Sequence, residues 1–250
     1  MNIIWLSANR FGYELLKEVV KLDDIKISSI ITLSSNSKTI MYDGIEDKKW
    51  YDFGIKVFKI DDINNEKNLI QNLSPYLIVV CGWRQLIRED ILRIPEAGFI
   101  AFHPTLLPIG RGSAPIINSI LQGFKESGLT MFYLSDKIDE GDIIGQVKFK
   151  IKKTDHASEV YQKIIDSGKI LIKKYLRLII QNTNPRIPQN DSKATYFKKP
   201  GLDINKLDFE NESIDKIYNK IRALSKPYNG AYIEKEGKKL IIWRAELLKD

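Results

Sequence analysis

The chain has 250 residues, of which 43% are hydrophobic and 28% charged, and its formal net charge is +7. This composition is that of a globular protein with a sizeable core. The single cysteine, Cys81, excludes an internal disulfide and argues against a cysteine-based zinc site, so no metal is expected. The lysines are dispersed, which favours a solvated surface over a nucleic-acid-binding face.

The apolar runs are too short to span a bilayer, so we expect no membrane partner. Residues 1–7 carry no charged leader and resemble a first strand rather than a signal peptide. Together with the single cysteine, these features favour the reducing cytoplasm as the location.

Apolar and amphipathic patterns mark each expected element. Strands are predicted at 2–7, 25–33, 55–60, 77–81, 99–102, 129–134 and 143–151, and helices near 13–20, 67–73, 113–121 and 157–180. Thr154 or Asp155 is the expected cap of the last helix. This order predicts an α/β fold with a mostly parallel, Rossmann-like sheet. Ligands of such sheets bind beyond the carboxyl ends of the strands.

A polar, proline-containing stretch at 181–192 predicts a linker. It separates an expected catalytic domain, residues 1–190, from a small C-terminal α+β lobe, residues 191–250. The lobe is expected to hold a helix over 214–224 and a hairpin that turns at Glu236-Gly237. It is too small to bury a core of its own and should pack on the larger domain.

Two segments at strand ends could carry chemistry. His103 lies in a stiff, proline-rich stretch over 102–115, and Asp139 lies in the acidic turn 136–142. A neutral imidazole beside a carboxylate is a common proton-transfer pair. The alternatives are a structural histidine and an exposed acidic turn, and the spacing of a calcium loop is absent. His156, at a helix start, is expected to be exposed to solvent.

These segments resemble the formyltetrahydrofolate-dependent formyltransferases, the family of the methionyl-tRNA, glycinamide ribonucleotide and nucleotide-linked amino-sugar enzymes. The resemblance lies in GWRQLIREDIL, GFIAFHPTLLPIGRGSAPI and the later IDEGDII. The tail IRALSKPYNGAYIEKEGKKLIIW is similar to the C-terminal segment of the sugar enzymes. The resemblance implies an enzyme that uses N10-formyltetrahydrofolate as formyl donor, and it implies a homodimer.

The resemblance also assigns roles to single residues. His103 matches the catalytic histidine and Asp139 the catalytic aspartate. The residues that match the two walls of the folate site are Gln85, Leu86, Ile87, Ile91, Ser135, Asp136 and Ile138. The residues expected to contact the substrate are Asn9, Arg10, Arg111 and Gly112.

Ala101 departs from the family pattern, which has Asn two residues before the histidine. In the family this Asn donates a hydrogen bond to the formyl oxygen, and losing such a donor costs about 10²–10³ in rate. Another donor, such as Gln85, could substitute. Otherwise the enzyme is slow, by nature or by engineering, or the chain binds its ligands without catalysis. Of these possibilities, we expect that another donor replaces the missing Asn.

The leading functional hypothesis is formyl transfer to the amine of a nucleotide-linked amino sugar, in glycan biosynthesis. A methionyl-tRNA formyltransferase is the first alternative, but the linker has a single Arg and no Lys to bind tRNA phosphates. A hydrolase that releases formate is a second alternative, although the known hydrolases carry an extra N-terminal domain. A binding protein for folate and nucleotide sugar is the third. The sequence does not define the sugar, the nucleotide or the carbon that bears the amine.

Overall fold

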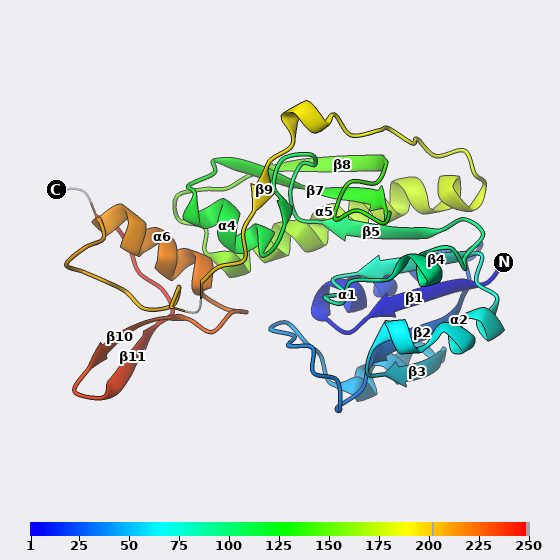
Figure 1. The fold of residues 1–250 in the computed structure, drawn as a ribbon, viewed down its shortest axis with the longest axis horizontal. Helices are drawn as coiled ribbons and strands as arrows, with labels where there is room; N and C mark the ends of the chain where they lie inside the picture. The colour runs from blue at the N-terminus through cyan, green and yellow to red at the C-terminus, as the bar shows by residue number, and fades with distance from the viewer. Residues whose placement is uncertain (202, 249–250) are drawn as a thin grey trace.

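The computed structural model describes residues 1–201 and 203–248. Within these residues the fold is centred on a seven-stranded sheet of order β3-β2-β1-β4-β5-β7-β8 (Figure 1). Its strands are β1 (Ile3–Ser7), β2 (Ile27–Leu33), β3 (Lys56–Ile60), β4 (Leu77–Cys81), β5 (Phe99–His103), β7 (Glu126–Tyr133) and β8 (Ile143–Lys150). Strands covered on both faces need continuous apolar runs, which is why these segments stand out in the sequence.

The sheet is mixed. Strands β3, β2, β1, β4 and β5 are parallel, whereas β7 is antiparallel to both β5 and β8. The expected α/β fold with a mostly parallel sheet is thus confirmed. The direction of β7 was not predicted, because apolar periodicity identifies a strand without giving its direction.

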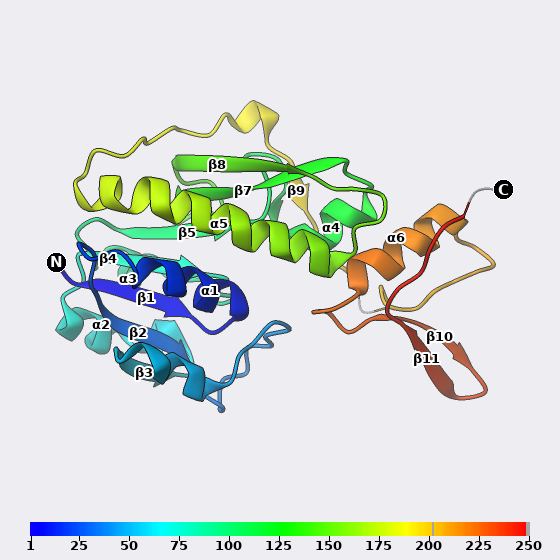
Figure 2. The same ribbon diagram turned by 180° about the vertical axis from the view of Figure 1, so that it is seen from behind.

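Helices cover both faces of the sheet. On one face lie α1 (Arg10–Val19), α4 (Pro115–Leu121) and α5 (Ala157–Ile180), and Figure 2 shows α5 beside α1 in front of the strands. On the other face lie α2 (Lys67–Leu73) and α3 (Glu89–Leu92). Alternate strand residues point to opposite faces, so Trp5 joins one core cluster and Ile4 the other. Short 3₁₀ helices occupy Asp47–Phe53, Ile63–Asn65 and Asp191–Lys193.

The C-terminal lobe contains α6 (Ile214–Leu224) and the hairpin of β10 (Ala231–Lys235) and β11 (Lys238–Ile242). The buried side chains of Ile217 and Ile221 belong to the same core cluster as Ile116 and Ile120 of α4. The hairpin projects away from the sheet (Figure 1). The lobe therefore shares its core with the larger part of the chain through α6.

The start of α5 differs from the prediction. The cap is His156, not Thr154 or Asp155, and its backbone N–H donates to Glu159 Oε2 at 2.9 Å in a capping box. The Asp155 carboxylate instead accepts from Lys152 N at 2.7 Å and pairs with Lys163. The expected exposure of His156 was also wrong, because its side chain packs against the ring of Tyr218 in α6 and only 2% of the residue is exposed.

The predicted linker contacts the sheet. Within it, Ile187 forms a bridge with Ile143. Just after it, β9 (Tyr196–Phe197) pairs in parallel with β6 (Arg111–Gly112). In Figure 1 this segment runs over the outer edge of the sheet before it reaches the lobe. The placement of the domain boundary near residue 190 remains a prediction.

In the described part of the chain, no helix is long and apolar enough to cross a membrane.

Candidate functional site

His103 is the last residue of β5 and lies on the face of the sheet that α3 covers. Its neighbour Phe102 points to the opposite face and packs against Phe11. The His103 side chain is 8% exposed, and its Nε2 lies 2.7 Å from the carbonyl oxygen of Gly110. Because a carbonyl only accepts, Nε2 carries a proton, and Nδ1 is the ring nitrogen that is left for other contacts.

Asp139 lies in the loop 134–142 between β7 and β8. Because β7 is antiparallel to β5, this loop starts beside Ile100 and folds back toward His103. The Asp139 Oδ2 atom lies 3.5 Å from His103 Nδ1, and the Asp139 side chain is 17% exposed. The structure thus brings together the two residues that the sequence singled out, with Nδ1 of the ring facing the carboxylate.

One short turn, Gly110–Arg111–Gly112, contacts both residues. The Gly110 carbonyl holds His103, and the Gly112 N–H donates to Asp139 Oδ2 at 2.8 Å. Gly112 has φ +97°, and a Cβ there would lie 2.7 Å from the backbone oxygen of Phe197. Only glycine fits this position, for steric and conformational reasons.

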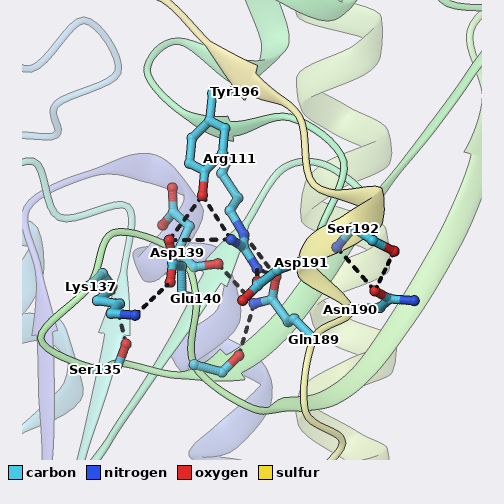
Figure 3. Close-up of polar contacts among 11 residues, drawn as sticks. Arg111, Ser135, Lys137, Asp139, Glu140, Gln189, Asn190, Asp191, Ser192 and Tyr196 are labelled. Atoms are coloured by element: carbon cyan, nitrogen blue, oxygen red, sulfur yellow. Dashed lines mark hydrogen bonds and ion pairs between the residues drawn. The ribbon is translucent and has the colours of Figure 1, made fainter.

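Arg111, expected to contact substrate, is fully buried with 0% exposure. Its guanidinium donates to Gln189, Asp191 and the Tyr196 hydroxyl, and it lies 3.3 Å from Glu140 (Figure 3). The Arg111 guanidinium therefore contacts protein groups and not solvent. Its pKa is raised: burial opposes the charge, but the hydrogen bonds to Asp191 and Tyr196 favour it.

Apart from Gln85, the expected folate residues divide into three groups. Leu86 and Ile138 present exposed apolar side chains, at 71% and 54%. Ile91 is fully buried, and Ile87 packs against the same core cluster. Ser135 donates to the carbonyl of its neighbour Lys137, and Asp136 is exposed.

Gln85 does not reach toward His103. Its amide nitrogen donates to Thr39 Oγ1 at 2.9 Å and to the Asp61 carbonyl at 2.7 Å. Its oxygen accepts from the backbone N–H of Ile63 at 2.9 Å. With both ends of the amide occupied, Gln85 holds the segment after β4 against neighbouring loops and is a poor replacement for the Asn missing at Ala101.

Asn9 and Arg10 follow β1. Asn9 is buried, caps α1 by accepting from Gly12 N at 3.0 Å, and donates to Asp43 Oδ2 at 3.0 Å. Arg10 is exposed, and its Nη2 donates to Gln162 Oε1 at 3.2 Å. Asn9 thus has a structural role that the sequence did not reveal, and Arg10 remains accessible.

Two family models match the chain. The model described as "Formyl transferase" matches residues 29–176, and the model described as "Formyl transferase, C-terminal domain" matches residues 203–250. The first alone covers more than half of the sequence. The chain belongs to the formyl transferase family.

Two curated members of the formyl transferase family are similar along nearly the whole chain. The bifunctional polymyxin resistance protein ArnA of Wigglesworthia glossinidia brevipalpis is 33% identical over 251 residues, 99% of this chain and 38% of that protein. The methionyl-tRNA formyltransferase of Halothermothrix orenii is 32% identical over 255 residues, 100% of this chain and 80% of that protein. The chain therefore spans well under half of the first relative and most of the second.

Solved formyl transferase structures share the fold. A sugar N-formyltransferase from Shewanella sp FDAARGOS_354 has a TM-score of 0.78 at 21% identity, covering 100% of this chain and 99% of that one. An N-formyltransferase from Helicobacter canadensis, solved with folinic acid and dTDP-3-aminofucose, has a TM-score of 0.72 at 22% identity, covering 96% and 86%.

Ala101, where the resemblance to the family leads us to expect Asn, lies on the same face of β5 as His103. It is 7% exposed and belongs to an apolar cluster against which Trp83 packs. Trp83 Nε1 and Thr105 Oγ1 are two of the five buried side-chain donors that have no hydrogen-bond partner among the described residues. Trp83 packs on the cluster of Ala101, and Thr105 donates its N–H to the His103 carbonyl at 2.8 Å. Because unpaired buried donors are uncommon, these two are candidates for the replacement donor.

Sequence reasoning missed a cluster around Asp43. Tyr161 of α5 donates to Asp43 Oδ2, and Arg84 lies 3.7 Å from Oδ1, which has no hydrogen-bond partner among the described residues. Burial, with the Asp43 charge as the next cause, raises the pKa of both Tyr161 and Tyr228, so both phenols stay protonated. Nothing in the irregular stretch around Asp43 indicated this cluster.

No group of three metal-ligating side chains occurs in the part of the chain that the structure describes.

Proposed function

We propose that the protein transfers a formyl group from N10-formyltetrahydrofolate to the amine of a nucleotide-linked amino sugar, with His103 and Asp139 as its catalytic residues. The observation that carries this proposal is the orientation of the His103 ring. Its Nε2–H is fixed by the Gly110 carbonyl, and its Nδ1 faces Asp139 Oδ2 at 3.5 Å. With Nε2 bound to the carbonyl, Nδ1 is the ring nitrogen that can take part in proton transfer, next to a carboxylate that can stabilise the charge.

The chemistry follows from this geometry. The amine nitrogen attacks the formyl carbon, a C–N bond forms, and the formyl oxygen gains negative charge. His103 Nδ1 accepts the proton that the new C–N bond makes acidic, and Asp139 stabilises the resulting imidazolium. The bond from the formyl carbon to N10 of the folate then breaks, and the proton passes from His103 to the departing nitrogen. A donor such as Trp83 Nε1 would stabilise the oxyanion.

The proposed folate site fits the residues present. A pterin ring is flat and largely apolar on its faces, and Leu86 and Ile138 expose apolar side chains on the two loops that the family resemblance assigns to it. Folinic acid in the Helicobacter canadensis structure supports a folate donor for this chain as well. The dTDP-3-aminofucose of the same structure supports an amino-sugar nucleotide as acceptor.

A screen identifies the substrate. The purified chain is incubated with N10-formyltetrahydrofolate and a panel of 3-amino and 4-amino nucleotide sugars, and products are detected by mass. We expect one amine to gain a formyl group. Folate binding without product from any of these amines or from methionyl-tRNA would instead support a binding protein. Light scattering on the same sample tests the proposed homodimer.

A methionyl-tRNA formyltransferase is the second candidate, favoured by the similarity to the Halothermothrix orenii enzyme. The linker argues against it. It has a single cation, Arg186, whose Cζ lies over the ring of Tyr133 at 3.8 Å from the centroid. Because tRNA phosphates bind to clusters of Lys and Arg, a salt-sensitive gel shift with methionyl-tRNA separates the two candidates.

A further inference from the structure

We propose that Gln189 is a positioning residue that holds the loop of Asp139 in its reactive geometry. The proposal rests on the formyl transfer described above and adds a residue that acts through Asp139. Gln189 lies in the segment between α5 and the lobe, where its neighbours Pro188 and Asn190 are exposed. Its own side chain is half-buried and turns inward, toward Arg111 and the loop 134–142 (Figure 3).

All hydrogen-bonding groups of the Gln189 amide are used. Its Nε2 donates to the carbonyls of Asp139 and Gly141, both at 2.8 Å. Its Oε1 accepts from Nε and Nη2 of Arg111 at 3.1 and 2.9 Å. The orientation of the amide is unambiguous, because a guanidinium only donates and carbonyls only accept.

The backbone that Gln189 holds is unusual. Asp139 has φ +57°, in the left-handed region. Gly141 packs so closely on the end of β7 that a Cβ there would lie 1.8 Å from the Tyr133 carbonyl oxygen. The Gln189 amide binds the two carbonyls at this tight point. The position of the Asp139 carboxylate relative to His103 therefore depends on Gln189 as well as on the Gly112 N–H.

Arg111 connects the Gln189 contact to the rest of the site. It is fully buried, and it is the middle residue of the turn whose flanking glycines contact His103 and Asp139. By binding Arg111 with its oxygen and the Asp139 loop with its nitrogen, Gln189 joins the supports of both catalytic residues. This arrangement gives Arg111 a structural role, and the substrate contact expected from the sequence stays a prediction.

Two substitutions separate the contacts of Gln189. Gln189→Glu keeps the acceptor for Arg111 and removes both donors to the carbonyls, whereas Gln189→Met removes every contact. Asp191→Asn is the matched control, because Asp191 pairs with the same guanidinium through a carboxylate that is 74% exposed. Thermal unfolding establishes that each variant is folded. If Gln189→Met does not fold, Gln189→Glu, with Arg111 still paired, carries the test.

The first readout needs no substrate, so it is independent of the proposed function. The chain has two histidines, His103 and His156, and long-range ¹H–¹⁵N spectra resolve both rings. Both Gln189 variants should change the ring ¹⁵N shifts of His103 and leave those of His156 unchanged. Asp191→Asn should change neither. Unchanged His103 shifts in a folded Gln189→Met protein would overturn the proposal.

The second readout uses the amine found in the screen. Both Gln189 variants should lower kcat by about tenfold or more, because small displacements of catalytic groups are costly. The KM values for amine and folate should change by less than about threefold. In an Asp139→Asn background, Gln189→Met should change kcat by less than about twofold, because both changes act on one group. An undiminished further loss in that background would assign Gln189 a purely structural role and refute the positioning role.

Discussion

His103 and Asp139 depend on backbone groups for their placement. The ring is oriented by a carbonyl and the carboxylate by an N–H, and both come from the same three-residue turn. Backbone groups of a glycine turn confined by neighbouring chain have little freedom, so this support is rigid. Such rigidity suits a proton transfer that requires donor and acceptor to be aligned.

Changing His103→Asn or Asp139→Asn should lower kcat by about 10²–10⁴, the range that general acid–base catalysis contributes. KM should change little, because neither substitution alters the shape of the site. Steady-state kinetics with the amine from the screen measures both constants. Glu126→Gln, an exposed carboxylate on β7, is the control and should behave as wild type. Near-normal turnover in either active-site variant would remove that residue from the mechanism.

Ala101→Asn tests whether a replacement donor is in place. If Trp83 Nε1 or Thr105 Oγ1 already stabilises the formyl oxygen, restoring the family's Asn should change kcat by less than about tenfold, or roughly 1.4 kcal/mol of barrier. A chain that forms no product as it stands but gains full transfer with Asn would show instead that the site lacks its donor. Single-turnover product formation, with folate binding measured separately, makes the comparison.

At the scale of elements, the order of the longer strands and helices could be predicted because each of them carries its own periodicity, whereas the short α3, β6 and β9 were not predicted. The ranges of α2, β4, α5 and α6 agree with the prediction residue for residue. Strand direction and long-range contacts could not be predicted, since neither leaves a local pattern. Gln189 illustrates this: it stands in a polar, proline-rich stretch, and only its distant partners Arg111 and Asp139 give it a role.

His156 shows the same limit at a helix end. Histidine is an uncommon cap, and the neighbouring Thr154 and Asp155 are common ones, so local preference favoured the wrong residues. In the fold, His156 is covered by Tyr218 of α6, a long-range contact that leaves no pattern in the local sequence. The pKa of His156 is lowered, with burial as the largest cause, so the ring is neutral at pH 7.

Glu159, the partner of His156 in the capping box, should make the stability of the protein depend on pH. Burial opposes its ionisation, but hydrogen bonds from Arg244, Ser158 and the His156 N–H lower its pKa from 4.5 to about 2. A lowered carboxylate pKa stabilises the fold above the unfolded value and loses this effect as pH falls through the folded value. Glu159→Gln should therefore lower the melting temperature at pH 7.

The difference in melting temperature between wild type and Glu159→Gln should shrink as pH falls from about 4.5 toward 2, the interval between the unfolded and folded pKa values. Melting curves of both proteins over this range measure it. A difference that stays constant down to the lowest pH would mean that the charge of Glu159 does not contribute.

At the scale of the whole molecule, the lobe and the larger part should unfold together. Ile221 of α6 is 5% exposed and shares a core cluster with Ile116 of α4. Truncating a buried Ile to Ala costs about 2–5 kcal/mol, so Ile221→Ala should lower the melting temperature of the entire chain. Calorimetry should show one transition in both proteins.

Leu240→Ala is the matched control for Ile221→Ala, because Leu240 on β11 is 65% exposed. An exposed truncation away from the core should change the free energy of unfolding by no more than about 0.5 kcal/mol. A separate, earlier transition that only Ile221→Ala moves would mean that the lobe is an independent folding unit.

The pairing of β9 with β6 determines where this protein can be recombined with its relatives. A chimera joined within 181–192, where composition alone suggests a boundary, would take Tyr196 and Phe197 from the foreign parent. The strand against which the Gly110–Gly112 turn is built would then come from a sequence that had not evolved with it. A junction placed after Phe197 exchanges the C-terminal lobe and leaves the native support of His103 and Asp139 intact.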